Sequence, residues 1–290
     1  MKEKKKVYII AFLAVLFWAF AFPFTKIAMM HFSPNALGFI RVVVGSITLL
    51  LIGIKAGNRM PKIKDLPLFL LTGGCGFAMY LFAFNRGIST ITSATSSIVI
   101  ALTPIFTAIW ASILYNEKIN KIGALSMITA FLGVCIIMLQ KGIVSINIGI
   151  IWTICAAVVF SVYNILNRIL GNMGYKAIEI VTYSMISSAL ELSVFSCQAT
   201  REIKTATMNE IIVVIALGVL SSAIAYYLWS KALSISKNTS DVTNFGFVTP
   251  LLATLIGGII LNEAMNIYTI IGGILIIGSV IIFAKKGKKI

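Results

Sequence analysis

The chain has 290 residues, of which 59% are hydrophobic and 11% charged, and its mean hydropathy is +1.00. Such proportions lie outside the range of soluble globular domains and indicate a protein that is solvated mainly by lipid. The formal net charge of +15 comes from basic residues that flank apolar segments. This pattern is typical of membrane topology and argues against a nucleic-acid partner.

The apolar segments predict an all-α integral membrane protein with ten spans, because a bilayer core about 30 Å thick is crossed by roughly 20 apolar residues. The first five predicted spans are Val7–Met30, Asn35–Lys55, Leu66–Asn85, Thr92–Leu114 and Lys121–Gln140. The second five are Ile148–Leu170, Ala177–Cys197, Glu210–Leu233, Thr239–Leu261 and Asn266–Ala284. The joints between them are too short to form a soluble domain, so the function is expected inside or between the spans.

The basic residues predict how the chain is oriented. One set of span ends carries Lys2, Lys4, Lys5, Lys6, Lys55, Arg59, Lys62, Lys64, Lys118, Lys121, Arg168, Lys176, Lys231, Lys237, Lys285, Lys286, Lys288 and Lys289. The opposite ends carry Lys26, Arg86, Lys141, Arg201 and Lys204. Because the more basic ends face the cytoplasm, we expect a multi-pass protein of the plasma membrane with both termini in the cytoplasm. The first apolar segment is long and aromatic and lacks a small-residue cleavage site, so it is predicted to be a retained helix.

The two halves of the chain repeat each other. With Tyr226 aligned on Tyr80, Thr249-Pro250 falls on Thr103-Pro104 and Asn262-Glu263 falls on Asn116-Glu117 without a gap. A second alignment places Phe160, Asn164 and Arg168 on Trp18, Phe22 and Lys26. An odd number of spans in each unit forces the second unit to enter the membrane from the other side. The sequence therefore predicts two inverted five-helix repeats, residues 1–145 and 146–290, an architecture that commonly holds its substrate between the repeats.

These repeated features resemble the EamA-type members of the drug/metabolite transporter superfamily. The resemblance rests on an aromatic first span, a tyrosine-rich third span, a fourth span with a central proline that ends in Asn-Glu, and a fifth span with small residues. It covers nearly the whole chain, and its motifs are specific only as a set. It implies ten helices, cytoplasmic termini and transport of a small organic metabolite, commonly by export. It does not name the solute, because such proteins handle amino acids, nucleosides, sugars, cations and drugs.

Candidate solute-contacting residues in the first half lie on the first, third and fourth spans. Trp18 and Phe22 share one face of the first span, and Tyr80 offers an aromatic ring with a polar tip, which suits an amphipathic or cationic solute. Ser96 is a further pathway candidate on the fourth span. Packing of the bundle is the alternative role for each of them. Pro104 is predicted to kink the fourth span, because proline removes a backbone hydrogen bond.

In the second half, Phe160, Asn164 and Asn167 form a mixed aromatic and amide stripe on the sixth span. Amides are costly in hydrocarbon, so these two are expected to face either a central cavity or a hydrogen-bonding partner on another helix. The eighth span adds Tyr226 and Trp229, and the ninth adds Asn244. Pro250 is predicted to kink the ninth span as Pro104 does the fourth.

Glu191 lies well within the seventh span, below a stripe of Ser184, Ser187 and Ser188. A carboxyl group at membrane depth is expensive and by default marks a functional site. It could bind an ammonium group of the solute, carry a coupling proton, or pair with a basic residue such as Arg41. A structural ion pair or contact with water at the end of the span is the alternative.

Other charged residues are expected to be structural. Glu117 and Glu263, at matched span ends, are predicted to cap helices or tie adjacent spans. Lys26 and Arg168 suit a gate, an anchor or an interfacial position. Glu179 and Asp241 lie near cytoplasmic span ends, where contact with water is expected. The four cysteines, Cys75, Cys135, Cys155 and Cys197, have no metal-ligand spacing and are predicted to be buried small apolar residues.

No cofactor, metal site or catalytic constellation is expected, because the sequence has one histidine, His31, scattered acidic residues and no Walker loop. The predicted function is therefore secondary transport of a small solute by alternating access, with Glu191 as the candidate for coupling to protons. Membrane lipids and a second copy of the chain are the other expected partners. An integral membrane enzyme acting on a lipid or isoprenoid is the alternative, although such enzymes usually cluster their acidic or histidine residues. A scaffold or sensor would have little use for paired kinks and buried amides.

Overall fold

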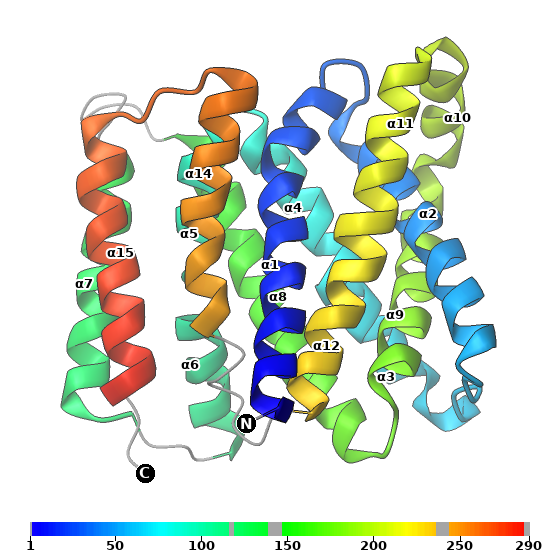
Figure 1. The fold of residues 1–290 in the computed structure, drawn as a ribbon, viewed down its shortest axis with the longest axis horizontal. Coiled ribbons are helices and arrows are strands. Elements are labelled where there is room, and N and C mark those ends of the chain that lie inside the picture. Colours follow the sequence, from blue (N-terminus) through cyan, green and yellow to red (C-terminus); the bar gives the residue numbers. More distant parts are fainter. Residues whose placement is uncertain (1, 116–118, 139–146, 236–243, 287–290) are drawn as a thin grey trace.

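The computed structural model describes residues 2–115, 119–138, 147–235 and 244–286, and within these ranges every regular element is a helix (Figure 1). The helices lie side by side along one direction. α1 begins and α15 ends at the same end of the bundle, which we call the basic end (Figure 1). The end at which α1 finishes is called the opposite end.

The first half of the chain forms α1 (Lys2–Ala28), α2 (Pro34–Lys55), the 3-10 turn η1 (Ile63–Asp65), α3 (Leu66–Gly73), the π-helical segment η2 (Gly74–Ala78), α4 (Met79–Ile88), α5 (Ser93–Ile100), α6 (Thr103–Tyr115) and α7 (Lys121–Met138). Local chemistry sets several of these boundaries. The hydroxyl of Ser33 accepts a hydrogen bond from the Ala36 backbone, and Pro34 takes the first helical position, so α2 begins there. The hydroxyl of Thr92 caps α5 in the same way.

The second half forms α8 (Ile148–Asn172), α9 (Ala177–Glu191), the 3-10 turn η4 (Leu192–Phe195), α10 (Ser196–Thr205), α11 (Met208–Ala216), the π-helical segment η5 (Leu217–Ile224), α12 (Ala225–Ile235), the 3-10 turn η6 (Asn244–Phe247), α14 (Val248–Leu261) and α15 (Ile267–Lys286). Thr207 and Glu210 form a reciprocal cap at the start of α11. Asn262 follows α14 with a φ of 52°. Asparagine tolerates this left-handed conformation, which ends the helix.

The described residues contain seven helical stretches that are long and apolar enough to cross a membrane, and three shorter apolar helices. The seven are Val7–Ala28, Pro34–Lys55, Ile63–Ile88, Ser93–Leu114, Ile148–Asn172, Ala177–Thr205 and Met208–Ala232, and the shorter ones are Lys121–Ile137, Val248–Leu261 and Ile267–Phe283. The chain is therefore an all-helical membrane protein, as predicted. The seventh predicted span ends at Cys197, whereas helix continues to Thr205, because polar α10 extends the stretch beyond its apolar part.

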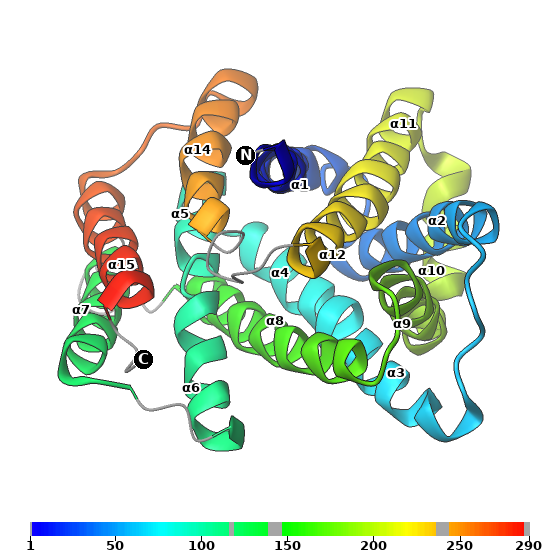
Figure 2. The same ribbon diagram turned by 60° about the horizontal axis from the view of Figure 1, so that its bottom comes forward.

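The two halves pack against each other along their length. α1 lies between α12 and α14, α4 packs against α8, and α2 packs against α9 (Figure 2). α7 and α15 form a pair at one edge of the bundle (Figures 1 and 2). α8 begins beside the end of α4, where Gly149 lies against Gly87 and Thr90. It therefore enters the bundle from the opposite end, whereas α1 enters from the basic end.

The pair of α7 and α15 is joined through small residues. A Cβ atom at Gly272 would lie 2.5 Å from the carbonyl oxygen of Gly133, and one at Gly133 would lie 2.8 Å from the carbonyl oxygen of Gly272. Such close backbone approach is typical of helix packing in lipid, where small residues permit contact. The small residues of the fifth and tenth predicted spans thus permit a helix contact within one chain.

We expect Gly272→Leu to separate α7 from α15, because a side chain larger than hydrogen would overlap the backbone of the facing helix. Overpacking of this kind costs about 1–3 kcal/mol. Thermal unfolding of the purified protein in detergent should show a lower midpoint for Gly272→Leu. Gly278→Leu is the matched control on the same helix, since a Cβ atom there would meet no atom within 4 Å. An unchanged midpoint for Gly272→Leu would contradict the close packing.

A buried carboxylate ties the two halves together at the basic end. Glu179 in α9 is 0% exposed and accepts hydrogen bonds from the backbone and the guanidinium of Arg59 at 3.0 and 3.1 Å. The hydrogen bond to Glu179 raises the pKa of Arg59. The prediction that Glu179 contacts water is therefore wrong: the loop after α2 folds over it. Asp241 and Glu117 lie outside the described residues.

The cysteines differ from their predicted role in one respect. All four are free thiols, and Cys75 is buried, but Cys135, Cys155 and Cys197 are exposed. The prediction of burial is wrong for these three, because apolar residues of a membrane protein can also lie on its lipid-facing surface.

Candidate substrate site

The predicted aromatic residues of the two halves meet in the middle of the bundle. We call Trp18, Phe77, Tyr80, Phe160, Tyr163, Tyr226 and Trp229 the aromatic cluster. Trp18 contacts Tyr226 and Trp229 with ring centroids 5.2 and 5.1 Å apart. Phe160 lies at its centre and contacts four rings, those of Trp18, Tyr80, Tyr163 and Tyr226, at 5.1–6.2 Å. Ring pairs at such separations are favourable beyond the area that they bury.

Each half contributes to this cluster from two spans. Trp18 comes from α1 and Tyr80 from α4, whereas Phe160 comes from α8 and Tyr226 from α12. These are the same residues that align between the two repeats of the sequence, Trp18 with Phe160 and Tyr80 with Tyr226. The cluster therefore lies where helices of the two halves pack together.

Two π-helical segments position the tyrosines. η2 ends at Ala78, two residues before Tyr80, and η5 ends at Ile224, two residues before Tyr226. A π turn widens the helix, reorients the side chains that follow and is frequent at functional sites. The Tyr226 hydroxyl donates a 3.3 Å hydrogen bond to the carbonyl of Gly76 inside η2. The ring of Tyr163 occupies the space that a side chain at position 76 would need.

Phe22 is connected to the cluster through one further ring. It contacts Phe84 at 5.3 Å, and Phe84 stacks on Tyr80 at 5.5 Å. Phe22 itself is buried. It therefore packs against the cluster indirectly, through Phe84.

The two predicted amides on α8 lie beside the cluster with hydrogen-bond partners. Asn164 is half-buried and donates to the Thr107 hydroxyl at 3.4 Å. Asn167, also half-buried, donates to the Tyr163 hydroxyl at 3.1 Å. Their partners are polar side chains within the bundle, so neither amide is left unpaired in hydrocarbon.

Arg41 is the only arginine or lysine among the buried polar residues of the described chain and is 4% exposed. Its guanidinium donates to the Thr25 hydroxyl at 3.2 Å and to the Ser222 hydroxyl, in η5, at 3.4 Å. It is close enough for its charge to act on the phenol groups of Tyr80 and Tyr226. Its Nε atom is buried and has no hydrogen-bond partner among the described residues.

Glu191 is the last residue of α9 and lies beside η2. Its carboxylate lies against Gly74, because a Cβ atom there would be 3.0 Å from Oε2. Within the described chain it makes no ion pair with Arg41, whose partners are the two hydroxyls. The carboxylate is half-buried, and Cys75 is one of its titratable neighbours. Three hydroxyls earlier on the same helix, those of Thr182, Ser184 and Ser188, are buried and have no hydrogen-bond partner in the part of the chain that the structure describes.

Ser96 lies in α5, and the two prolines lie in α6 and α14. Ser96 in α5 is 0% exposed, and its hydroxyl has no partner among the described residues. The helix is interrupted at Ala101 and Leu102, just before Pro104. The Thr103 hydroxyl donates to the carbonyl of Ile100 at 2.7 Å, the group that Pro104 leaves without its usual donor.

Pro250 lies in the first turn of α14, where its missing N–H costs little, and a 3-10 turn precedes it. Asn244 begins that turn, and its side chain lies outside the described part of the structure.

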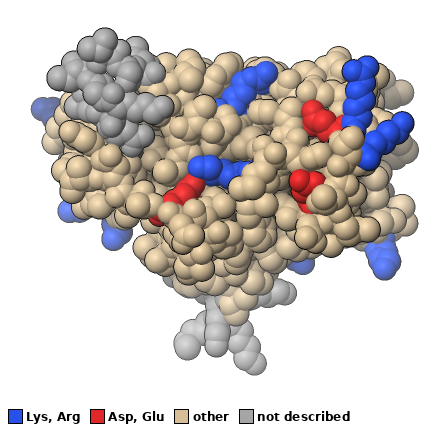
Figure 3. Space-filling view, turned by 90° about the horizontal axis from the view of Figure 1, so that it is seen from above, with Lys and Arg blue, Asp and Glu red and all other residues tan. Residues whose placement is uncertain are grey.

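A salt bridge joins the two halves at the opposite end. Lys26 Nζ lies 2.6 Å from Glu263 Oε1 and also donates to the Ile91 carbonyl at 3.0 Å. The second carboxylate oxygen of Glu263 accepts from the Ser93 backbone at 2.8 Å. Glu263 therefore caps α5 and ties α1 to the joint after α14. Figure 3, which views this end, shows acidic side chains beside basic ones on a largely uncharged face.

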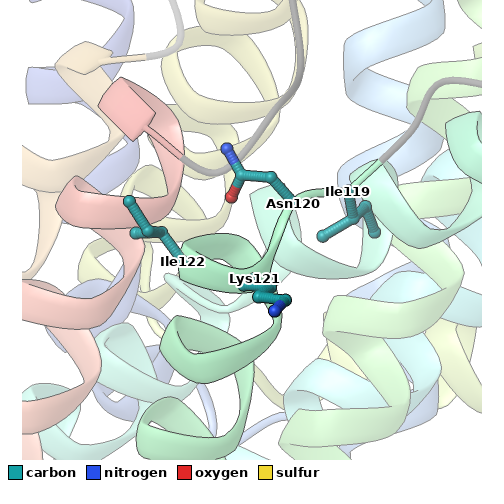
Figure 4. A pocket seen from close by; sticks show the side chains of 4 residues that line it. All are labelled: Ile119, Asn120, Lys121 and Ile122. Carbon is teal, nitrogen blue, oxygen red and sulfur yellow. The ribbon is translucent and has the colours of Figure 1, made fainter.

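One surface hollow lies elsewhere, at the turn between α6 and α7. It measures about 430 Å³ and is lined by Ile119, Asn120, Lys121 and Ile122. Figure 4 shows these side chains pointing in different directions around the turn. Asn120 donates to the Lys286 carbonyl at 2.6 Å and accepts from the Gly123 backbone at 2.9 Å. The lining includes none of the predicted site residues.

Sequence reasoning missed several members of the site. Tyr163 follows Phe160 by one helical turn, so the face chosen on the sixth span could have included it. Arg41 carries a charge inside a span, which is the same signal that singled out Glu191. Phe77 and η2 have no sequence signal beyond the small residues Gly73, Gly74 and Gly76.

Comparison with known proteins gives one consistent result. A sequence model of the "EamA-like transporter family" matches residues 5–139 and again residues 147–284. A solved crystal structure is similar in fold, with a TM-score of 0.66 at 18% identity, and the alignment covers 96% of this chain and 95% of the other.

Curated relatives cover almost the full length of the chain. The "Uncharacterized transporter YdfC" of Bacillus subtilis is 27% identical, over 96% of this chain and 91% of its own. An "Uncharacterized transporter" of Archaeoglobus fulgidus is 29% identical, over 97% and 100%. A "Probable terminal-alkyne amino-acid exporter" of Streptantibioticus cattleyicolor is 26% identical, over 99% and 95%.

Proposed function

Because the chain belongs to the EamA-like transporter family and is a multi-pass membrane protein with transporter relatives, we propose that it moves a small organic metabolite across the bacterial plasma membrane by alternating access. The proposed solute class is an amino acid, an amine or a similar molecule. The proposal goes beyond the family in naming a site, a cycle and a direction, and each rests on separate observations.

We propose ten transmembrane helices in two inverted repeats, residues 1–145 and 146–290. The seven long apolar stretches and the three shorter apolar helices supply that number of crossings. The family model matches once in each half. η2 and η5 occupy equivalent positions before Tyr80 and Tyr226, and α1 and α8 begin at different ends of the bundle. The lysines at the basic end support a cytoplasmic position for both termini.

The proposed site rests mainly on one observation: equivalent aromatic residues of the two halves contact each other. Trp18 and Tyr80 contact Phe160 and Tyr226, at the interface that rocking of one half against the other would open and close. The rings suit an apolar or cationic part of a solute. Asn164 and Asn167 add polar groups beside them.

We propose export as the direction of transport. The relative from Streptantibioticus cattleyicolor is named as an exporter of an amino acid, and export is common in the family that the sequence resembles. The names of the relatives also favour transport over the alternative of a lipid-modifying enzyme.

Transport by the purified protein in proteoliposomes tests this function. A ligand-stabilisation screen with amino acids, nucleosides, polyamines and quaternary amines would first identify compounds that raise the unfolding temperature. Radiolabelled forms of these compounds should then exchange across the liposome membrane only when the protein is present. Binding without exchange would contradict the proposed function.

Coupling to protons is proposed to use Glu191. Its carboxylate lies against η2 without an ion-pair partner in the described chain, so protonation would change the charge inside the bundle. Glu191→Gln imitates the protonated form at every pH. We expect wild-type transport to respond to an imposed pH gradient and the variant to lose that response. Glu202→Gln, near the opposite end, is the control, and an unaltered response in Glu191→Gln would rule out this role.

A further inference from the structure

A buried guanidinium without a carboxylate is the least expected feature of the bundle interior. Arg41 is 4% exposed, and its polar partners are two neutral hydroxyls, those of Thr25 and Ser222, at 3.2 and 3.4 Å. Its Nε–H has no acceptor among the described residues. A guanidinium carries five N–H donors, so most of its hydrogen-bonding capacity is unused.

A buried guanidinium without an opposite charge costs free energy in a membrane protein. A charged side chain inside a span is costly, and those that occur pair with an opposite charge or mark a substrate pathway. The acidic residues that the structure describes within the bundle are engaged elsewhere or lie against other elements. Glu179 binds Arg59 and Glu263 binds Lys26. Buried Asp65 accepts a hydrogen bond from the Tyr175 hydroxyl, and Glu191 lies against Gly74. The opposite charge for Arg41 is therefore missing from the described chain.

The position of Arg41 connects it to the aromatic cluster. Its partner Ser222 precedes Tyr226 by one helical turn on the same span, and its partner Thr25 follows Trp18 by two turns along α1. It also lies within electrostatic range of Tyr80 and Tyr226. The guanidinium thus lies at the edge of the cluster that faces the opposite end of the bundle.

We propose that Arg41 binds the carboxylate of the transported solute, while the aromatic cluster holds its apolar or aromatic part. This inference rests on the proposed function and narrows the solute to organic carboxylates. The planar guanidinium suits a bidentate carboxylate contact. The long hydrogen bonds to Thr25 and Ser222 go to neutral acceptors, so a carboxylate could replace them as stronger partners.

Matched ligand pairs test this proposal on the wild-type protein. L-Phenylalanine, L-leucine and 4-phenylbutyrate would be compared with their amides and methyl esters, which keep the apolar part and lose the negative charge. The unfolding temperature of the full chain in nanodiscs is the measurement. We expect at least one acid to stabilise the protein with a Kd about tenfold or more lower than that of its amide and ester.

Arg41→Gln and Arg41→Lys provide the second measurement. We expect Arg41→Gln to remove the preference for acid over amide and Arg41→Lys to weaken it. Lys26→Gln is the matched control, because it removes a cation that already has a carboxylate partner, and it should keep the preference. If Arg41→Gln does not fold, the comparison of acid with amide in the wild-type protein and in Arg41→Lys still decides the matter.

The outcomes separate this proposal from the proposed function. Equal stabilisation by acids, amides and esters, or tighter binding of amines such as phenethylamine, would overturn the role of Arg41 while transport of another solute class continues. A preference for acids that persists in Arg41→Gln would also overturn it. Binding of acids without any exchange in proteoliposomes would support the carboxylate site and contradict the transport function.

Discussion

Replacing Phe160 with alanine is expected to reduce transport about 30-fold while the protein stays folded. Phe160 contacts four rings that come from three other positions on α1, α4 and α12 and from Tyr163 on its own helix. A solute group that packs on Phe160, and on the rings that Phe160 holds in place, would lose about 0.5–1.5 kcal/mol for each aromatic contact removed. We therefore expect the variant to lose about 2 kcal/mol of solute binding, which corresponds to about 30-fold in affinity. Initial rates of exchange in proteoliposomes across a range of solute concentrations measure the effect.

A matched substitution separates this effect from general destabilisation. Phe106→Ala also removes a partly buried phenylalanine with a ring partner, since Phe106 contacts Phe131 at 6.0 Å. It lies on α6 and packs against α7, outside the aromatic cluster. We expect a similar fall in unfolding temperature for both variants and a loss of solute affinity only for Phe160→Ala. Equal solute affinity in the two variants would show that Phe160 does not contribute to the solute site.

Reversing one charge of the Lys26–Glu263 pair is expected to reduce transport about tenfold. In an alternating-access cycle the opposite end must close as well as open, and this 2.6 Å salt bridge joins the halves there. Lys26→Glu would place two carboxylates together and favour separation of the halves. The charged pair also positions Ser93 at the start of α5. Exchange rates in proteoliposomes, with Lys26→Gln as the neutral comparison, measure this effect.

The reversed pair provides the decisive control. Lys26→Glu combined with Glu263→Lys restores opposite charges at the same two positions. We expect the double variant to recover part of the lost rate, although a lysine at position 263 cannot accept the hydrogen bond from Ser93. No recovery in the double variant, with normal transport by Lys26→Gln, would mean that the pair does not act as a gate.

Much of the helical order was predictable because lipid imposes a strong constraint on the sequence. Apolar runs of span length can only be helices in a bilayer, and the observed starts of α2, α8 and α9 lie within a residue of those predicted. The alignment of Trp18 with Phe160 and of Tyr80 with Tyr226 identified rings that the structure brings into contact. The alignment was informative because the aligned residues lie where the two halves of the chain pack together.

Contacts that depend on side-chain direction could not be predicted. The fold of the loop after α2 over Glu179 depends on Arg59, which a charge pattern assigns only to a span end. The π segments arise from one extra residue in a turn, and apolar sequence hides this. The partners of Arg41 come from α1 and η5, far apart in sequence. Glu263 was correctly expected to tie adjacent helices, because a carboxylate that follows a helix end can reach the start of a neighbouring one.

Alternating access requires a solute site between the two halves that water reaches from each side in turn. A cysteine at Asn164, which is half-buried beside the aromatic cluster, tests this in a chain whose four native cysteines are replaced. A charged, membrane-impermeant thiol reagent added on either side of oriented proteoliposomes should label this cysteine, and bound solute should slow the labelling. Ile259→Cys, on an 80% exposed position of α14 expected to face lipid, should stay unlabelled. If the reagent labelled the control but did not label Asn164→Cys from either side, a water-accessible site between the halves would be contradicted.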